Sequence, residues 1–406
     1  MHSLARSLAR LLALLLMLSA LAACAGAPGP TVLSRPAETA ASSPEGAVQA
    51  TGRPSTADAS KQAVTYLDQL SPALKMNTHR AAHTATLLPD GKVLIAGGFR
   101  EEGTAEISIA SAEIYDPETN TFTPTSDMNE GRSGHTATLL SNGKVLIVGG
   151  WGPSHRLATA ELYDPHAGTF SYTASLSAPR AGMTATLLKD GRVLMAGGDS
   201  ARNTPQLVAE IYDPDTKTFA LAGSLNTGRS AHTATLLNDG TVLIAGGSSG
   251  DSSVLASAEV YNPTTGKFTL TGSMSRVRYK HAAVLLQDGN VLVIGGSNQN
   301  DWRGKYTSAE IYDAKTGAFI AAADLNSERF KLPDAAVLLD NGNVLVGGGN
   351  RQMEIFDAKS GRFILSKQLD DHYYFAVLTP LKNGSVLITG GYDPGIQPTD
   401  QAWVYN

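Results

Sequence analysis

Cysteine is almost absent from the chain, which has one such residue, Cys24, among its 406 residues. Without a second cysteine the chain forms no internal disulfide and offers no cluster of thiolates to a metal. An excess of basic residues is also absent, since 32 Lys and Arg stand against 37 Asp and Glu. The composition therefore gives no electrostatic sign of nucleic-acid binding, and we expect no nucleic-acid partner.

The first residues, MHSLARSLARLLALLLMLSALAAC, have the order of a secretory signal peptide. Arg6 and Arg10 precede an apolar run from Leu11 to about Leu21, and small residues follow. Because this run is shorter than a transmembrane span requires, we interpret residues 1–23 as a signal peptide.

The stretch LAAC, which ends at Cys24, resembles the lipobox of bacterial lipoproteins. The resemblance implies cleavage before Cys24 and acylation of that residue, and several acyl chains anchor a protein stably. The alternative is an ordinary signal peptide with an incidental cysteine. Residues 24–61, rich in Ala, Gly, Pro, Ser and Thr, predict a flexible linker. We therefore expect a lipid-anchored protein of the bacterial cell envelope, held outside the cytoplasm at the outer membrane or cell surface.

The rest of the chain repeats one phrase, as in RSGHTATLLSNGKVLIVGG from Arg132 and RSAHTATLLNDGTVLIAGG from Arg229. Each of seven copies reads apolar strand, Asp-Gly or Asn-Gly, apolar strand, Gly-Gly, and successive copies lie 42 to 53 residues apart. The first glycines of the pairs are Gly97, Gly149, Gly197, Gly246, Gly295, Gly348 and Gly390. A strand-only period of this length is typical of a β-propeller.

Each repeat predicts four strands, which in the second copy are HTATLL, VLIVGG, AELYDP and GTFSYTASL. Asn-Gly between the first two favours a tight hairpin, and proline ends the third. The last repeat stops at Asn406 after three strands. The segment VTYLDQLSPALKM before the first repeat places Leu70 and Met76 at the spacing of a fourth strand. We therefore predict an all-β fold over residues 62–406, a seven-bladed propeller whose N-terminal strand completes the last blade and closes the ring.

These repeats resemble the kelch family of β-propellers. The resemblance rests on the Gly-Gly pairs, on the AEIYDP strand with its tyrosine, and on the aromatic residue that follows. Kelch repeats usually have tryptophan at that last place, where this chain has Phe122, Phe170, Phe219, Phe268, Phe319 and Phe363.

A cation precedes the hairpin glycine by eleven residues in six of the seven repeats. These axial cations are Arg80, Arg132, Arg180, Arg229, Arg278 and Lys331. They are expected to ring one mouth of the central channel, either to bind an anion, as arginines do in resembling kelch adaptors, or to pair with the recurrent glutamate of AEIYDP. The seventh repeat has Tyr373 and Trp403 at the two places, and loss of cation and glutamate together favours structural pairing.

Histidine recurs at the start of the first strand, as His83, His135, His232 and His281. Met183 and Asp334 interrupt the series, and separate blades hold the rings apart, so we interpret these residues as core histidines. The sequence predicts no metal site and no cofactor.

Function is expected where the repeats differ, in the loops after Gly-Gly and before the arginine, which share one face of the ring. Aromatic and arginine side chains in these loops are typical anchors of interfaces and also stack on sugar rings. The candidate binding residues are Trp151, Arg156, Tyr279, Trp302, Arg303, Tyr306, Arg351, His372, Tyr373 and Tyr392.

The catalytic domain of galactose oxidase also resembles this chain, since it is a seven-bladed kelch propeller with copper near its axis. Its copper chemistry needs a cysteine cross-linked to tyrosine, and this chain has no cysteine after Cys24. We predict a non-catalytic binding module with no catalytic residues, which presents its variable loops to a protein or glycan partner. The alternatives are a carbohydrate-active enzyme, with Asp371, His372 and Tyr373 as candidates at the axial mouth, and a purely structural role in the envelope.

Overall fold

The computed structural model describes residues 69–406, apart from 104, 201, 251–252 and 299–302. The predicted signal peptide, Cys24, the linker and Trp302 lie outside the described residues. The described residues belong to one compact unit. Its described part contains no helix, and hence none long and apolar enough to cross a membrane.

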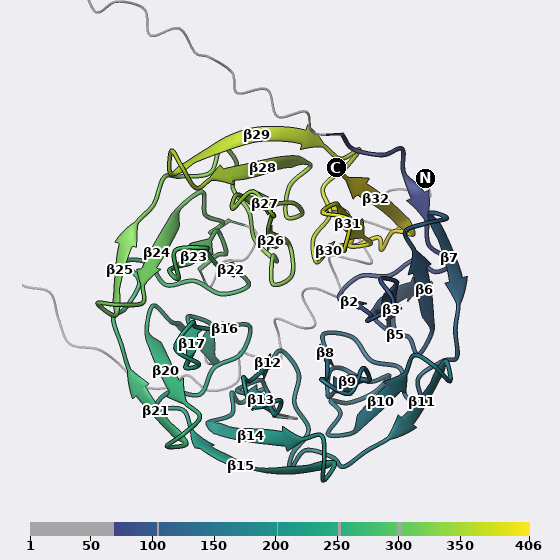
Figure 1. Ribbon diagram of the computed structural model, residues 1–406, viewed down its shortest axis with the longest axis horizontal. Helices are drawn as coiled ribbons and strands as arrows, with labels where there is room; N and C mark the ends of the chain where they lie inside the picture. Colours follow the sequence, from purple (N-terminus) through teal and green to yellow (C-terminus); the bar gives the residue numbers. More distant parts are fainter. Residues whose placement is uncertain (1–68, 104, 201, 251–252, 299–302) are drawn as a thin grey trace, which may run out of the picture. The chain divides into compact units, whose positions relative to one another are not determined.

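Seven four-stranded sheets surround a common axis, which confirms the predicted propeller (Figure 1). Neighbouring strands within each sheet are antiparallel, and the first strand of each repeat lies innermost. From the inner to the outer strand, the blades are: β2 (Thr84–Leu87), β3 (Val93–Ala96), β6 (Ala112–Asp116) and β7 (Thr121–Pro124); β8 (Thr136–Leu139), β9 (Val145–Val148), β10 (Ala160–Asp164) and β11 (Thr169–Tyr172); β12 (Thr184–Leu187), β13 (Val193–Ala196), β14 (Val208–Asp213) and β15 (Thr218–Ser224); β16 (Thr233–Leu236), β17 (Val242–Ala245), β20 (Ala258–Asn262) and β21 (Lys267–Leu270); β22 (Ala282–Leu285), β23 (Val291–Ile294), β24 (Ala309–Asp313) and β25 (Ala318–Ala321); β26 (Ala336–Leu338), β27 (Val344–Val346), β28 (Gln352–Asp357) and β29 (Arg362–Gln368); and β30 (Val377–Pro380), β31 (Val386–Thr389), β32 (Gln401–Tyr405) and β1.

The ring closes where the N-terminal strand β1 (Leu74–Lys75) joins the last blade. β1 runs antiparallel to β32, with Leu74 opposite Ala402. An isolated bridge between Leu70 and Tyr405 extends this pairing. The predicted closure is confirmed, and the two ends of the described chain lie in the same blade.

The second strand of each blade is the buried centre of its sheet. All four residues of β9, Val145–Val148, are buried, as expected for an apolar run with a blade packed on each face. Three of the recurrent tyrosines, Tyr163, Tyr212 and Tyr312, join neighbouring blades through their hydroxyls. Tyr163 and Thr125 oxygens are 3.1 Å apart, and the equivalent Tyr212 and Thr173 oxygens are 2.9 Å apart.

The Gly-Gly pair follows this buried strand because the chain turns there against the next blade. Gly149 has φ 62°, and a Cβ on it would stand 2.6 Å from the carbonyl oxygen of Arg180. No side chain fits at such a distance, so the repeat requires glycine.

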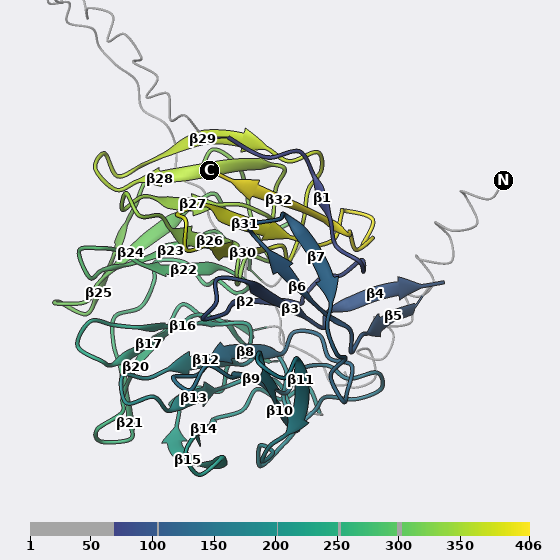
Figure 2. The same cartoon turned by 45° about the vertical axis from the view of Figure 1, so that its right-hand side comes forward.

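Two short hairpins follow Gly-Gly on the variable face, in the first and fourth blades. They are β4 (Phe99–Glu102) with β5 (Ala105–Ser108), and β18 (Ser248–Gly250) with β19 (Ser253–Val254). Figure 2 shows the β4–β5 hairpin projecting from the ring.

Candidate functional site at the axial mouth

The recurrent arginines are buried inside the blades, each paired with the glutamate of its own repeat. The distances from Arg Nη2 to Glu Oε1 are 2.5–2.9 Å in six pairs, and every one of these arginines is 0% exposed. The other guanidinium nitrogen of Arg229 donates to the carbonyl of Gly246 at 2.7 Å. The structural pairing that the sequence favours is therefore confirmed for these arginines, because glutamate and backbone carbonyls enclose them.

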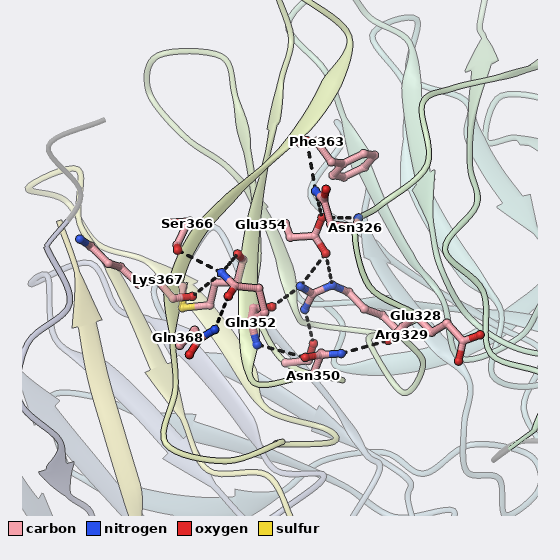
Figure 3. Close-up of polar contacts among 12 residues, drawn as sticks. Asn326, Glu328, Arg329, Asn350, Gln352, Glu354, Phe363, Ser366, Lys367 and Gln368 are labelled. Carbon is pink, nitrogen blue, oxygen red and sulfur yellow. Dashed lines mark hydrogen bonds and ion pairs between the residues drawn. The ribbon is translucent and has the colours of Figure 1, made fainter. Parts of the chain in front are cut away.

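Each glutamate also holds the segment that enters from the preceding blade. Glu354 accepts hydrogen bonds from the Asn326 backbone N–H at 2.7 Å and from its side chain at 2.8 Å (Figure 3). Burial lowers the pKa of Arg329, and the Glu354 charge opposes this effect. Glu354 therefore neutralises the buried Arg329 and also links its blade to the segment that enters from the preceding one.

The sixth blade corrects the assignment of Lys331, because Arg329 fills the cation position there. Arg329 Nη2 lies 2.9 Å from Glu354 Oε1, and the carbonyl of Arg329 approaches Gly295 as the carbonyl of Arg278 approaches Gly246. Two additional residues, Pro333 and Asp334, separate this arginine from its hairpin glycine. Counting back eleven residues from Gly342 therefore reaches Lys331 instead of Arg329.

In the seventh blade an aromatic contact replaces the ion pair. The ring centroids of Tyr373 and Trp403 lie 5.2 Å apart, and Tyr373 is only 4% exposed. The Tyr373 hydroxyl donates to Asp370 Oδ1 at 3.0 Å, and burial raises its pKa. Tyr373, predicted as a binding residue, is thus turned into the blade. His372 lies beside Asp371, at 3.5 Å.

The four recurrent histidines lie between blades, and each faces a threonine of the preceding blade. His135 Nε2 is 3.0 Å from Thr84 Oγ1, and His232 Nε2 is 3.0 Å from Thr184 Oγ1. Burial and the neighbouring arginine lower the pKa of His135 and of His232 to about 3. The third blade has Met183 at this place, and the Thr136 hydroxyl that faces it has no hydrogen-bond partner.

One residue of each blade has a left-handed backbone just before the histidine position, with φ between 50° and 65°. Backbone hydrogen bonds link several of these residues from blade to blade around the axis, as from Ala231 N–H to the Gly182 carbonyl and from Lys280 N–H to the Ala231 carbonyl. They mark the axial mouth on the variable face, and they are Ala82, Gly134, Gly182, Ala231, Lys280, Lys331 and Phe375.

Aromatic rings and lysines gather on one side of this mouth, contributed by the fifth, sixth, seventh and first blades. We call this group the mouth cluster, and it consists of Phe99, Tyr279, Lys280, Lys305, Phe330, Lys331, Tyr374, Phe375 and Tyr392.

Lys331 lies at the centre of the mouth cluster. Its Nζ is 4.9 Å from the Phe330 ring centroid and 5.1 Å from that of Tyr392, and it donates to the Tyr392 hydroxyl at 2.5 Å. Lys305 Nζ lies 5.1 Å from the same Phe330 centroid. Cation–π attraction of this kind is worth about 0.5–2 kcal/mol for each contact. The arrangement holds ammonium groups beside an aromatic wall.

Three carboxyl groups near the axial mouth have raised pKa values. Burial raises the pKa of Glu106 on the β4–β5 hairpin, and the Lys331 charge opposes that shift. Surrounding protein also raises the pKa of Asp334, although this residue keeps contact with solvent. Burial raises the pKa of Asp199, with Ser230 and Arg156 acting against it.

The structure brings only some of the predicted binding residues to this mouth. Tyr392 and Tyr279 belong to the mouth cluster, and Tyr306 lies beside it with its ring centroid 5.6 Å from the Arg278 guanidinium. Arg303 and Arg351 are exposed on the same face. Trp151 and Arg156 form a separate pair in the second blade. Lys280, Lys331 and Phe375 stand where other repeats have glycine or alanine, and that substitution is the sequence signal for the mouth cluster.

Comparisons with known proteins agree with this architecture. Residues 80–129, 132–177 and 229–275 match the sequence profile of the Kelch motif. An F-box/kelch-repeat protein of Arabidopsis thaliana, SKIP30, is 35% identical over 80 residues, which are 20% of this chain. The match spans 22% of the length of that relative.

Two solved structures share the fold. A fungal alcohol oxidase of the AA5 family, in complex with copper, superposes with a TM-score of 0.69 at 16% identity, over 84% of this chain and 76% of its own. A structure of YjhT superposes with a TM-score of 0.54 at 12% identity, over 82% of this chain and 96% of its own.

The described residues do not fit a copper centre like the one named for the fungal oxidase. The mouth cluster offers tyrosines and lysines, whereas the recurrent histidines lie in separate blades and face threonines. In the part of the chain that the structure describes, no three His, Cys, Asp or Glu side chains are close enough to hold a metal. Three segments of the chain thus match the Kelch motif, and the described residues form a β-propeller of seven four-stranded blades.

Proposed function

We propose that the chain is a binding module whose axial mouth receives an acidic segment of a partner protein. Kelch β-propellers are common protein-interaction scaffolds. The observation that carries the proposal is the mouth cluster, in which the partly exposed Lys280 and Lys305 lie on the variable face above buried aromatic rings and the buried Lys331. Aromatic residues are enriched among interface hot spots, and lysines there attract carboxylates and steer the encounter.

The proposal includes the location of the module. Cys24 would hold the propeller at the membrane through its acyl chains, outside the cytoplasm of a bacterial cell. The support is the lipobox-like sequence LAAC and the apolar run before it. Replacing Cys24 by serine is expected to abolish incorporation of a fatty-acid label and to release the protein from membranes. A labelled, membrane-bound Cys24→Ser protein would contradict the anchor without affecting the binding proposal.

Charge reversal at the mouth tests the binding proposal. Lys280→Glu with Lys305→Glu is expected to weaken capture of partner proteins from envelope extract at least about tenfold and to reduce the salt dependence of binding. The matched control is Lys359→Glu, which lies in a turn of the opposite face. Equal capture by the mouth variant and the control would contradict the proposal.

A further inference from the structure

A second exposed feature of the variable face lies outside the mouth cluster, in the second blade. Trp151 follows the Gly-Gly pair and is 46% exposed, although tryptophan is the largest apolar side chain. The Arg156 guanidinium carbon stands 3.7 Å from the centroid of its ring. One face of the indole therefore rests on a guanidinium plane, and much of the remaining ring surface is open to solvent.

The local backbone holds Trp151 in place. Its N–H donates to the Ser133 carbonyl at 2.8 Å, and its own carbonyl accepts from the Ser133 N–H at 2.9 Å. A bridge pairs Trp151 with Arg156 across a turn closed by the hydrogen bond from Gly152 N–H to the His155 carbonyl. A ring fixed in this way loses little conformational freedom when a ligand covers it.

Arg156 is itself held by the next blade. It is 5% exposed, and its Nη2 donates to Asn203 Oδ1 at 2.6 Å. Burial lowers the pKa of Arg156, and the charge of the nearby Asp199 carboxylate opposes this shift. The loops of the second and third blades thus fix the guanidinium under the indole, and we call Trp151 with Arg156 the Trp151 platform.

The groups around the platform are polar. Ser154 and His155 are exposed in the turn next to the indole, and Asn203 and Asp199 stand on the adjoining loop. A single flat aromatic ring bordered by hydrogen-bonding groups matches a ligand that has one apolar face and a polar edge. A pyranose has this form, because its axial C–H groups meet the negative face of the indole while its hydroxyls reach the neighbouring side chains.

We infer that the Trp151 platform binds a neutral β-linked pyranose chain, at a site separate from the proposed protein-binding mouth. A β-1,4-linked sugar presents broad C–H faces because its ring substituents are equatorial. The Arg156 guanidinium supports the indole from below and fixes its orientation, so that the other face stays open to the sugar.

The test is an NMR titration of the ¹⁵N-labelled propeller with chitohexaose and, separately, with cellohexaose. The three tryptophans give three indole N–H signals, and Trp151→Phe identifies the signal of Trp151. We expect one of the two sugars to shift that signal saturably. Trp151→Ala is expected to weaken binding at least about tenfold, a loss of about 1.4 kcal/mol. Trp151→Phe should keep most of the affinity because a ring remains.

Matched variants separate the platform from general surface effects. Tyr172→Ala removes an even more exposed ring, 54% exposed, from the outer strand of the same blade and is expected to leave sugar affinity unchanged. The amide spectrum of each variant shows whether it is folded. Absence of saturable binding of both sugars up to about 10 mM would overturn the inference, and so would equal affinities of wild type and Trp151→Ala.

The two proposals fail separately. If Lys280→Glu with Lys305→Glu loses protein capture and neither sugar binds, the protein-binding mouth is supported and the glycan site is contradicted. If sugar binding depends on Trp151 and the lysine changes leave protein capture unaffected, the glycan site is supported and the protein-binding mouth is contradicted. If Trp151→Ala weakens protein capture and no sugar binds, the platform belongs to the protein interface and the glycan inference is wrong.

Discussion

The histidines buried between blades should lower the stability of the propeller in mild acid, because each of them takes up a proton when the chain unfolds. The pKa of His135 falls from 6.5 to about 3 on folding, so between these values the unfolded chain binds a proton that the folded chain does not. Stability therefore falls as pH decreases through this window, by about 1.4 kcal/mol per pH unit for each such histidine. From about pH 7 to about pH 5.5, one histidine accounts for about 1.2 kcal/mol.

The third blade provides the matched perturbation, because Met183 occupies the histidine position there. His135→Met should reduce the stability difference between about pH 7 and about pH 5.5 by about 1.2 kcal/mol, and Met183→His should increase it by the same amount. The comparison uses the pH dependence alone, so the general cost of either substitution cancels.

Urea denaturation at the two pH values, followed by tryptophan fluorescence, measures both free energies of unfolding. Met183→His has a second expected effect at about pH 7, a gain of about 1 kcal/mol, because the new imidazole can bond the Thr136 hydroxyl that lacks a partner. If His135→Met and wild type lose the same stability on acidification, His135 is not held neutral and the reasoning is refuted.

Three further predictions concern the repeat itself. Arg229→Ala should lower the free energy of unfolding by about 3–5 kcal/mol, because it leaves Glu259 buried and unpaired. The double change of Arg229→Met with Glu259→Gln should cost less stability than Arg229→Ala, and urea denaturation midpoints compare the two; an equal or larger loss in the double variant would contradict this. In the seventh blade, Tyr373→Arg alone and Trp403→Glu alone should each destabilise by at least about 3 kcal/mol, and the double variant should recover part of that loss by restoring the pair of the other blades; an additive double variant would refute this. Gly149→Ala should lower the thermal midpoint by several degrees, because its Cβ would stand 2.6 Å from the Arg180 carbonyl, whereas Gly103→Ala, which meets no atom within 4 Å, should have a smaller effect that reports its positive φ alone.

The repeat pattern predicted most of the fold because each signal in it has a direct structural cause. Gly149 is required by the approach of the Arg180 carbonyl, and the β9 run is apolar because blades cover both faces. The shared loss of cation and glutamate in the last repeat indicated their pairing. In the structure Tyr373 and Trp403 occupy the two vacated positions in mutual contact.

The candidate site was less predictable because small local changes decide it. The insertion of Pro333 and Asp334 shifted the count that assigned Lys331 to the arginine ring, while the backbone places Lys331 among aromatic rings. Tyr373 and Tyr374 are adjacent in sequence, yet one turns into the blade and the other towards the mouth. Such directions depend on backbone geometry that a residue pattern does not specify. The Trp151 platform likewise joins two loops about 50 residues apart, through the bond from Arg156 to Asn203.

The proposed role of the axial mouth is tested most directly by site-specific photo-crosslinking in cells. A benzophenone amino acid replaces Lys280 at the mouth in one protein and Lys359 in the opposite face in another. We expect a discrete crosslinked partner from position 280 that is absent from position 359. Crosslinking from position 359 alone, or equally from both positions, would contradict the claim that the mouth cluster is the binding site.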